Sequence, residues 1–291
     1  MMVSDASLHP VQVCFVVDDV SRAAKDCAKR FGWGPFQGFT ADVDARYRDW
    51  RGRKLTDVAL GMAGRVQVEL IHVREGNDAV ATYQSRYGRG FQHLGISCRS
   101  REAAIARLEE LGASVDDVNE FDGVKIAFVD VPTGPAMFEL LEPTRADAAG
   151  GATRQHENAP SPAQGVFAID RATLVTADME RALSFYAKAF GWPAAEPARE
   201  TLRHPGGEQV CLRYLGKAGS LRLELVSPIA AGDDPYSRHL ERGEHGLVHA
   251  GGRWIGETPG GALADHEWLE QAERFSLLDW EGGSRGLQVR E

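Results

Sequence analysis

Apolar residues recur at every second position in residues 65–71, which predicts a β-strand with one buried face. Positions 66, 68 and 70 are aliphatic, so Glu69 lies on the opposite face of this strand. A helical pattern is equally clear after Asp19, where apolar residues at 20, 23, 24, 27 and 31 form one stripe that ends at Gly32. Asp19 is well placed to cap this helix. The chain therefore switches between strand and helix periodicity.

The strand predicted over residues 89–97 carries a histidine on its polar face. Alternation places His93, Gly95 and Ser97 on one face, while the apolar residues at 94, 96 and 98 lie on the other. Ser100 then caps a helix predicted over residues 101–111. The imidazole thus belongs to a strand whose other face packs on a helix.

Further strands follow each of these strand–helix pairs. After the first helix, weak strands are predicted over residues 46–50 and 56–62, before the strand at 65–71. After the second helix, strands are predicted over residues 125–129 and 136–141. The first half of the chain therefore contains two units, each with the order strand, helix and several further strands.

The same unit returns in the second half. The motif Phe-Gly-Trp at 31–33 begins 19 residues after Gln12, and the same motif at 190–192 begins 19 residues after Arg171. The helix predicted over residues 179–190 matches the first helix of the chain. This spacing indicates an internal duplication.

The polar residues of the strands recur with the repeat. Glu69 precedes His93 by 24 residues, and Glu224 precedes His249 by 25. Each histidine ends a Gly-x-x-His motif. A histidine whose surroundings recur in this way is a candidate functional residue.

The duplication predicts two domains, over residues 8–143 and 166–291. Residues 144–165 are rich in Pro, Ala, Gly and polar residues and are predicted to be a linker. The last unit is the weakest copy, since two adjacent glycines interrupt its expected helix within 258–264.

Composition and charge narrow the functional classes. The net charge of -9 argues against a nucleic-acid or acidic-membrane partner, and no apolar run approaches the roughly 20 residues that a membrane span needs. The N-terminus lacks the apolar core of a signal peptide. The four cysteines form no CxxC pair, which favours reduced, buried thiols and a cytoplasmic location.

The repeated unit resembles the vicinal oxygen chelate superfamily, which includes glyoxalase I, methylmalonyl-CoA epimerase, bleomycin resistance proteins and extradiol dioxygenases. The resemblance rests on the two Phe-Gly-Trp helix ends and on strands with the pattern Glu-Leu-x-x-Pro at 139–143 and 224–228. It implies an α+β fold in which tandem βαβββ modules form two cupped mixed sheets with flanking helices. The fold does not fix the reaction, because many chemistries share it.

The resemblance also implies one divalent metal in the N-terminal half. The positions that match the family's ligands are Gln12, Glu69, His93 and Glu139. Two carboxylates, an imidazole and an amide oxygen suit Zn, Ni, Co, Mn or Fe. His72 lies on the helix-facing side of its strand and is expected to be structural.

The C-terminal half departs from this pattern, because Arg171 stands at the first ligand position. Arg171, Glu224 and His249 are therefore expected to form a polar cluster that holds no metal and binds a carboxylate or stabilises the cup. Arg222 is expected to point the same way, and the fourth position falls on residues 290–291.

The leading hypothesis is a metal-dependent enzyme that stabilises an enolate or enediolate in isomerisation, epimerisation or glyoxalase-like lyase chemistry on a small carbonyl compound. Glu139 is the first candidate for the base and Glu69 the second. Tyr47 and Arg89 are candidates for binding substrate at the rim of the cup. A monomer and a homodimer are both compatible with four modules in one chain.

Two alternatives stay open. The first is a metal-free protein that binds a small molecule, as in bleomycin resistance, and Gln12 and Arg171 favour it. The second is an extradiol ring-cleaving dioxygenase, which is expected to place two histidines and a glutamate in its C-terminal half. Arg171 stands where the first of those histidines would lie.

Overall fold

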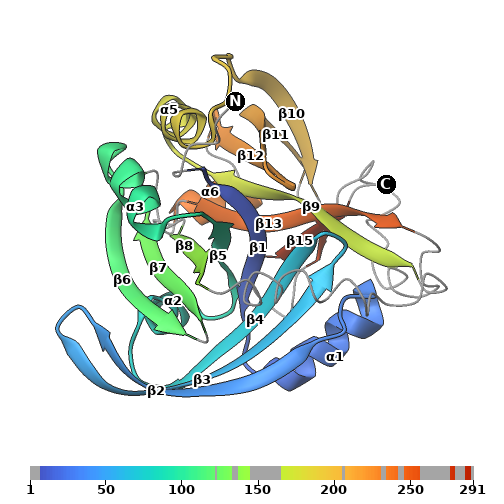
Figure 1. Cartoon of the computed structure of the whole chain (residues 1–291). Coiled ribbons are helices and arrows are strands. Elements are labelled where there is room, and N and C mark those ends of the chain that lie inside the picture. Colours follow the sequence, from blue (N-terminus) through green and yellow to red (C-terminus); the bar gives the residue numbers. More distant parts are fainter. Residues whose placement is uncertain are drawn as a thin grey trace.

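Two large β-sheets, one from each half of the chain, make up most of the molecule in the computed structural model (Figure 1). The structure describes residues 7–121, 123–132, 137–144, 165–204, 207–230, 234–241, 246–255, 276–278 and 286–289. Helices flank both sheets. The predicted α+β fold of tandem βαβββ modules is confirmed.

The N-terminal half has the predicted order of strand, helix and three strands, twice. Its elements are β1 (His9–Val16), α1 (Val20–Phe31), β2 (Gln37–Tyr47), β3 (Trp50–Ala63), β4 (Val66–Glu75), α2 (Ala79–Tyr87), β5 (Gly90–Ser97), α3 (Arg101–Glu110), β6 (Ser114–Phe121), β7 (Val124–Asp130) and β8 (Met137–Pro143). The strand order in the sheet is β2-β3-β4-β1-β5-β8-β7-β6. The two modules therefore meet where β1 pairs with β5, antiparallel, and each first strand lies parallel to the last strand of its own module.

The C-terminal half repeats this arrangement. Its elements are β9 (Val166–Val175), α5 (Met179–Phe190), β10 (Ala198–His204), β11 (Gly207–Ala218), β12 (Leu221–Pro228), α6 (Pro235–Glu241), β13 (Gly246–Ile255), β14 (Ser276–Leu278) and β15 (Gly286–Val289). The strand order β10-β11-β12-β9-β13-β15-β14 matches the N-terminal sheet strand for strand, apart from the last strand. The interrupted helix predicted near 258–264 lies outside the described residues.

Helix boundaries follow the capping residues. The carboxylates of Asp19 and Asp178 accept hydrogen bonds from backbone N–H groups in the first turns of α1 and α5. Gly32 and Gly191 end these helices in the left-handed conformation, with φ of 67° and 69°. The Ser100 hydroxyl caps α3 in the same way. The predicted caps at Asp19 and Ser100 and the predicted stop at Gly32 are confirmed.

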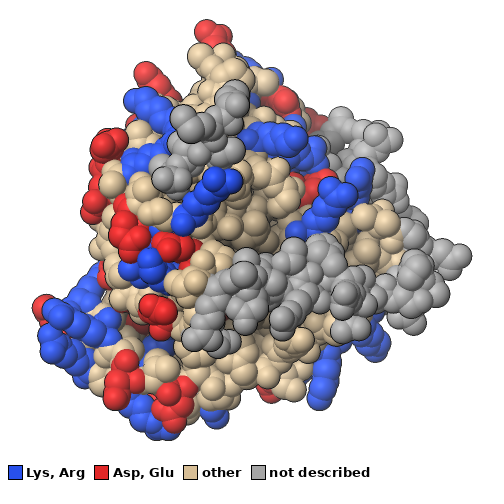
Figure 2. Space-filling view, viewed as in Figure 1, with Lys and Arg blue, Asp and Glu red and all other residues tan. Residues whose placement is uncertain are grey.

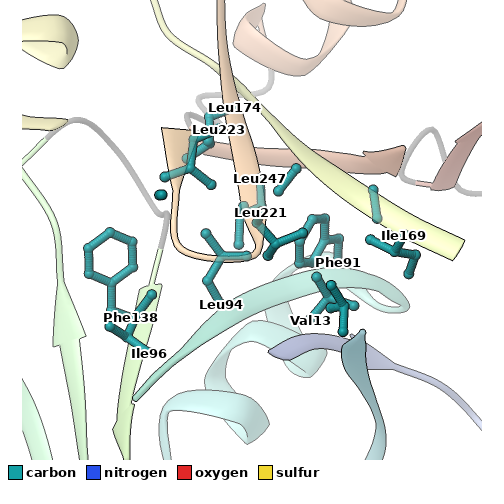
Figure 3. Packing of buried hydrophobic residues seen from close by; sticks show 14 of the residues in the cluster. Val13, Phe91, Leu94, Ile96, Phe138, Ile169, Leu174, Leu221, Leu223 and Leu247 are labelled. Atoms are coloured by element: carbon teal, nitrogen blue, oxygen red, sulfur yellow. The ribbon is translucent and has the colours of Figure 1, made fainter. Parts of the chain in front are cut away.

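One continuous apolar core joins the two halves. It takes residues from β1, β5 and β8 on one side and from β9, β12 and β13 on the other (Figure 3). Aromatic residues of the helices add to it, as where the rings of Phe138 on β8 and Phe185 on α5 lie 6.4 Å apart. The side of β1 that carries Val13 and Phe15 thus faces this core. The other side of β1 is part of the concave surface of the N-terminal sheet. We call that concave surface the N-terminal cup.

The N-terminal sheet nearly closes into a barrel, because its edge strands β2 and β6 approach each other. The Tyr47 hydroxyl donates a hydrogen bond to the Asp116 carboxylate at 2.7 Å, and Phe39 stacks on Phe121 with ring centroids 5.8 Å apart. Helix α2 contributes Val80 and other residues to an apolar cluster inside the cup. The cup is therefore walled by strands and covered in part by a helix.

Some sequence predictions of local structure are wrong. The strand predicted over residues 46–50 is instead a hairpin between β2 and β3, and Arg48 turns the chain with φ of 53°. Helices α2 and α6, which precede β5 and β13, were not predicted.

The charged surface is mixed in sign. On the face that Figure 2 shows, Lys and Arg side chains are interspersed with Asp and Glu. Among the described residues, no helix is both long and apolar enough to cross a membrane.

Candidate metal centre in the N-terminal cup

The four predicted ligands lie on the four central strands of the N-terminal sheet. Gln12 is on β1, Glu69 on β4, His93 on β5 and Glu139 on β8, and these strands are neighbours. All four side chains are buried. The alternation of strand residues explains the arrangement. Both sequence neighbours of Glu69 and of Glu139 face the shared core, as do Val13 after Gln12 and Leu94 after His93.

Three of these side chains converge on one point. The Nε2 atom of His93 lies 3.1 Å from Oε2 of Glu69 and 3.3 Å from Oε2 of Glu139. His93 has no exposed surface. The structure thus brings an imidazole and two carboxylates together, as the sequence predicted for these three residues.

The His93 ring is oriented by its neighbours. Its Nδ1 contacts Oε1 of Gln92, and its ring lies edge-on to Phe128 with centroids 5.4 Å apart. The Gln92 amide in turn donates to the sulfur of Met137 at 3.3 Å. An Nδ1–H bonded to Gln92 leaves Nε2 directed at the carboxylates, which is the usual orientation of a metal-binding histidine.

Several buried polar atoms of this cluster make no well-aligned hydrogen bond within the described part of the chain, although Nε2 of His93 and Oε2 of Glu69 lie close to each other. They are Oε1 of Gln12, Oε2 of Glu69 and Nε2 of His93. Buried polar atoms are normally satisfied, so three such atoms in one cluster require an explanation. A cation bound between them would satisfy all three.

The electrostatics point in the same direction. Burial alone would lower the pKa of His93, but the charges and hydrogen bonds of Glu139 and Glu69 outweigh it and raise the pKa to about 9. Burial and the nearby Glu69 raise the pKa of Glu139, although His93 opposes the rise. Two buried carboxylates this close together need a positive charge between them, and an imidazolium or a metal ion provides it.

Gln12 differs from the other three predicted ligands, because its side-chain hydrogen bond within the described residues goes to Gln67 and not to one of them. Its Nε2 donates to Oε1 of Gln67 at 2.9 Å, which leaves Oε1 as the atom that could serve a cation. The side chain lies across Gly95, where an added Cβ would come within 2.3 Å of Oε1. Glycine at position 95 therefore gives the Gln12 amide its space.

Sequence reasoning missed Cys14. Its sulfur, a carboxylate oxygen of Glu69 and a ring nitrogen of His93 all lie within 4.8 Å of one another, a grouping that could hold a metal ion. Cys14 is fully buried, and both its burial and the charge of Glu69 hold the pKa of its thiol well above the ordinary value. The signal was available, because Cys14 follows Gln12 by two residues and so shares its face of β1.

The two residues predicted at the rim are engaged elsewhere in the fold. Tyr47 is buried and bonded to Asp116, and Arg48 joins the same carboxylate at 2.7 Å. Arg89 precedes β5 and forms an ion pair with Asp18 at 3.2 Å. His72, expected to be structural, contacts the Val17 carbonyl through Nδ1 at 3.0 Å.

The corresponding face of the C-terminal sheet, which we call the C-terminal cup, carries arginines instead. Arg171 is 1% exposed, and its Nε lies 3.4 Å from a carboxylate oxygen of Glu224. The Thr173 hydroxyl donates to Glu224 as well, and Arg213 on β11 donates from Nε at 2.6 Å. Arg222, which was expected to point the same way, forms an ion pair with Asp170, and Arg213 provides the second guanidinium at Glu224.

Backbone pairing places the two cups in the same register. Arg171 pairs with Gly251 as Gln12 pairs with Gly95, and His249 pairs with Thr173 as His93 pairs with Cys14. An added Cβ at Gly251 would come within 2.6 Å of the Arg171 guanidinium. The predicted fourth position, residues 290–291, lies outside the described residues.

All four cysteines are free and buried, as predicted; they are Cys14, Cys27, Cys98 and Cys211.

Comparisons with known proteins agree with the fold. Two family models, both described as the glyoxalase/bleomycin resistance protein/dioxygenase superfamily, match residues 11–128 and 168–254. No curated protein matches the chain.

Several solved structures share the fold. A triple mutant of 4-hydroxymandelate synthase from Streptomyces coelicolor is 16% identical, with a TM-score of 0.62 over 94% of this chain and 77% of that one. A hypothetical protein from Staphylococcus aureus is 12% identical, with a TM-score of 0.53 over 97% and 98%. A variant of homoprotocatechuate 2,3-dioxygenase from B. fuscum is 11% identical, with a TM-score of 0.50 over 98% and 72%.

Identities this low show the fold alone. The two family matches, one in each half, carry the assignment further, and they agree with the two sheets of equivalent strand order. The chain therefore belongs to the glyoxalase/bleomycin resistance protein/dioxygenase superfamily, also called the vicinal oxygen chelate superfamily, with two glyoxalase domains in tandem.

Proposed function

We propose that the protein is an enzyme that binds one divalent metal in its N-terminal cup and transfers a proton next to the carbonyl of a small substrate. The observation that carries the proposal is the contact of the His93 Nε2 with both Glu69 and Glu139, in a buried cluster with unpartnered oxygen and nitrogen atoms. When bound, the metal would act as a Lewis acid that favours an enolate or enediolate.

The residues present fit such a metal. Glu69, His93 and Glu139 would hold it, with the amide oxygen of Gln12 beside them, and Zn, Ni, Co, Mn and Fe all accept such donors. We place no metal in the C-terminal cup, because the Arg171 guanidinium already contacts Glu224 there.

Glu139 is our candidate for the group that moves the proton. Burial raises the pKa of its carboxyl, and a base with a raised pKa gives up and takes back a proton near neutral pH more readily than an ordinary carboxylate. Glu69 is the second candidate. Isomerisation, epimerisation and a glyoxalase-like lyase step all need such a transfer.

The surroundings suit a small, partly apolar substrate. Met137, Phe128 and Tyr83 belong to the apolar cluster inside the cup, and they would exclude water from the reacting atoms. Arg89, Tyr47, Arg171, Glu224 and His249 stay as proposed substrate-binding residues. Of these, Tyr47 is occupied by its bond to Asp116.

A second candidate function is the metal-free binding of a small molecule. Gln12 favours it, because a neutral amide is a weaker metal ligand than a carboxylate or an imidazole. A dioxygenase is less well supported, since the iron sites of such enzymes usually combine two histidines with one carboxylate, and the N-terminal cluster has one histidine.

We also propose the domain boundaries 8–143 and 166–291, joined by the linker 144–165. They are supported by β8, which ends at Pro143, and by β9, which begins at Val166. A cytoplasmic location is supported by the four free, buried thiols.

Elemental analysis of the purified protein tests the proposal. We expect about one divalent metal per chain after reconstitution with Zn, Ni, Co, Mn or Fe, and its loss in His93→Ala and in Glu139→Ala. His72→Ala is the matched control, because this histidine contacts the Val17 carbonyl away from the cluster. Failure of the wild-type protein to retain any of these metals would refute the enzyme mechanism and favour the binding function.

A metal-loaded protein then permits a test of the reaction. Small carbonyl compounds are incubated in deuterated water, and exchange of the hydrogen next to the carbonyl is followed by NMR. We expect exchange in the wild type and its loss in Glu139→Gln with retained metal. Exchange at the wild-type rate in that variant would remove Glu139 as the base.

A further inference from the structure

Cys14 lies level with the two residues whose ligand atoms most need a cation. It pairs directly with Glu69 across the parallel β1–β4 ladder and with His93 across the antiparallel β1–β5 ladder. Its sulfur lies within 4.8 Å of a ligand atom of each, and Oε2 of Glu69 and Nε2 of His93 have no hydrogen-bond partner in the described part of the chain. The thiol therefore borders the same point as the imidazole and the carboxylate.

The second cup provides an independent view of this position. Thr173 occupies there the place of Cys14, because it pairs with Glu224 and with His249 as Cys14 pairs with Glu69 and His93. The Thr173 hydroxyl donates directly to the Glu224 carboxylate. A side chain at this position thus reaches the carboxylate of the neighbouring strand, and in the N-terminal cup that side chain ends in sulfur.

Gln12 is less well placed at the same level. It pairs with Gln67 and Gly95, which lie two residues along their strands from Glu69 and His93. Its side-chain N–H group is bonded to Gln67. If β1 provides a ligand at the level of the other two, Cys14 is the residue that does so.

We propose that Cys14 binds the metal of the N-terminal cup as a thiolate, and that this ligand makes the site selective for thiophilic metals. The inference rests on the proposed function, since it presupposes a metal there. On binding, the S–H proton passes to solvent while the sulfur–metal bond forms, and no electron is transferred. A thiolate favours Zn, and also Co, Ni or Fe, over Mn, which prefers oxygen ligands.

X-ray absorption spectroscopy of the metal-loaded protein tests this assignment. With Zn bound, we expect a sulfur shell at about 2.3 Å beside nitrogen and oxygen at about 2.0–2.2 Å. With Co²⁺ bound, we expect thiolate-to-metal charge-transfer absorption in the near ultraviolet. Both signals should disappear in Cys14→Ser and persist in Cys98→Ser, a matched control because Cys98 is a buried thiol that contacts the Leu141 carbonyl.

Competition experiments provide a second readout. We expect the preference for Zn over Mn to decrease in Cys14→Ser and to be unchanged in Cys98→Ser. If Cys14→Ser does not fold, the wild-type spectra decide alone, because they report the sulfur shell directly.

The outcomes separate the two proposals. Stoichiometric metal with a sulfur shell supports both. Stoichiometric metal with nitrogen and oxygen ligands only overturns the assignment of Cys14 and leaves the proposed function standing. Binding of Mn but not of Zn or Co also overturns the assignment of Cys14 alone, and no binding of Zn, Ni, Co, Mn or Fe overturns both.

Discussion

The stability of the metal-free protein should decrease as the pH rises from 6.5 to 9. In the folded chain the pKa of His93 is about 9, against an ordinary value of 6.5. Burial lowers this pKa, but the carboxylates of Glu139 and Glu69 raise it further than burial lowers it. Without a metal, the imidazolium is the positive charge that these carboxylates need.

The direction of this change in stability follows from proton linkage. Because the pKa of His93 is raised on folding, its contribution to stability is fully present below pH 6.5 and is lost as the pH rises through about 9. One pKa unit is worth about 1.4 kcal/mol, so the rise from 6.5 to about 9 corresponds to about 3 kcal/mol. The raised pKa of Glu139 acts with the same sign, since the folded protein holds that proton more tightly as well.

Urea unfolding at several pH values, with a chelator present, measures this directly. We expect the free energy of unfolding to fall by about 3 kcal/mol between pH 6.5 and 9, and saturating Zn to remove most of the fall. An NMR titration of the imidazole resonances, assigned by their loss in His93→Gln, should give a pKa near 9. A flat stability profile together with a His93 pKa near 6.5 would refute the reasoning.

Three further predictions concern stability and can be measured by urea unfolding. Glu224→Ala should cost about 3–5 kcal/mol because it removes the buried carboxylate that contacts both Arg171 and Arg213, whereas Arg171→Met should cost less, because the carboxylate keeps its other donors; the reverse order would contradict this account. Asp78→Ala should cost about 2–4 kcal/mol, since it removes both the α2 cap and the partner of a part-buried lysine, and a change below about 0.5 kcal/mol would refute that role. Gly95→Ala should cost about 1–3 kcal/mol and weaken metal binding, because the new Cβ would lie 2.6 Å from Cβ of Gln12; wild-type stability and affinity would show that the sheet accommodates the methyl group.

Much of the fold could be predicted because the duplication samples each unit twice. The helices α1 and α5 share an aspartate cap and a left-handed glycine stop, and these local signals are visible in the chain. The hairpin at Arg48 was missed because its turn lacks the glycine or asparagine that usually adopts positive φ. Helix α2 was missed because its 9 residues offer only two turns of pattern.

In the candidate site, too, some residues could be predicted from the sequence and others could not. His93, Glu69 and Glu139 could be placed from their spacing and their strand faces, and the structure brings them together. Arg213 could not be placed, because its contact with Glu224 depends on the register of β11 against β12, which local patterns do not specify. Cys14 was passed over because its apolar surroundings suggested a structural thiol, although its strand face was known.

The two cups solve one electrostatic problem in two ways. Each buries a glutamate on its fourth strand, and a buried carboxylate is stable only beside a positive charge. In the C-terminal cup Arg171 and Arg213 provide that charge from within the chain, so the cluster needs no external ion. In the N-terminal cup the corresponding side chain is the neutral Gln12, and a second buried carboxylate, Glu139, increases the need. A proton on His93 meets that need only below about pH 9, whereas a bound metal ion meets it above pH 9 as well, and this difference is why we place the chemistry in the N-terminal half.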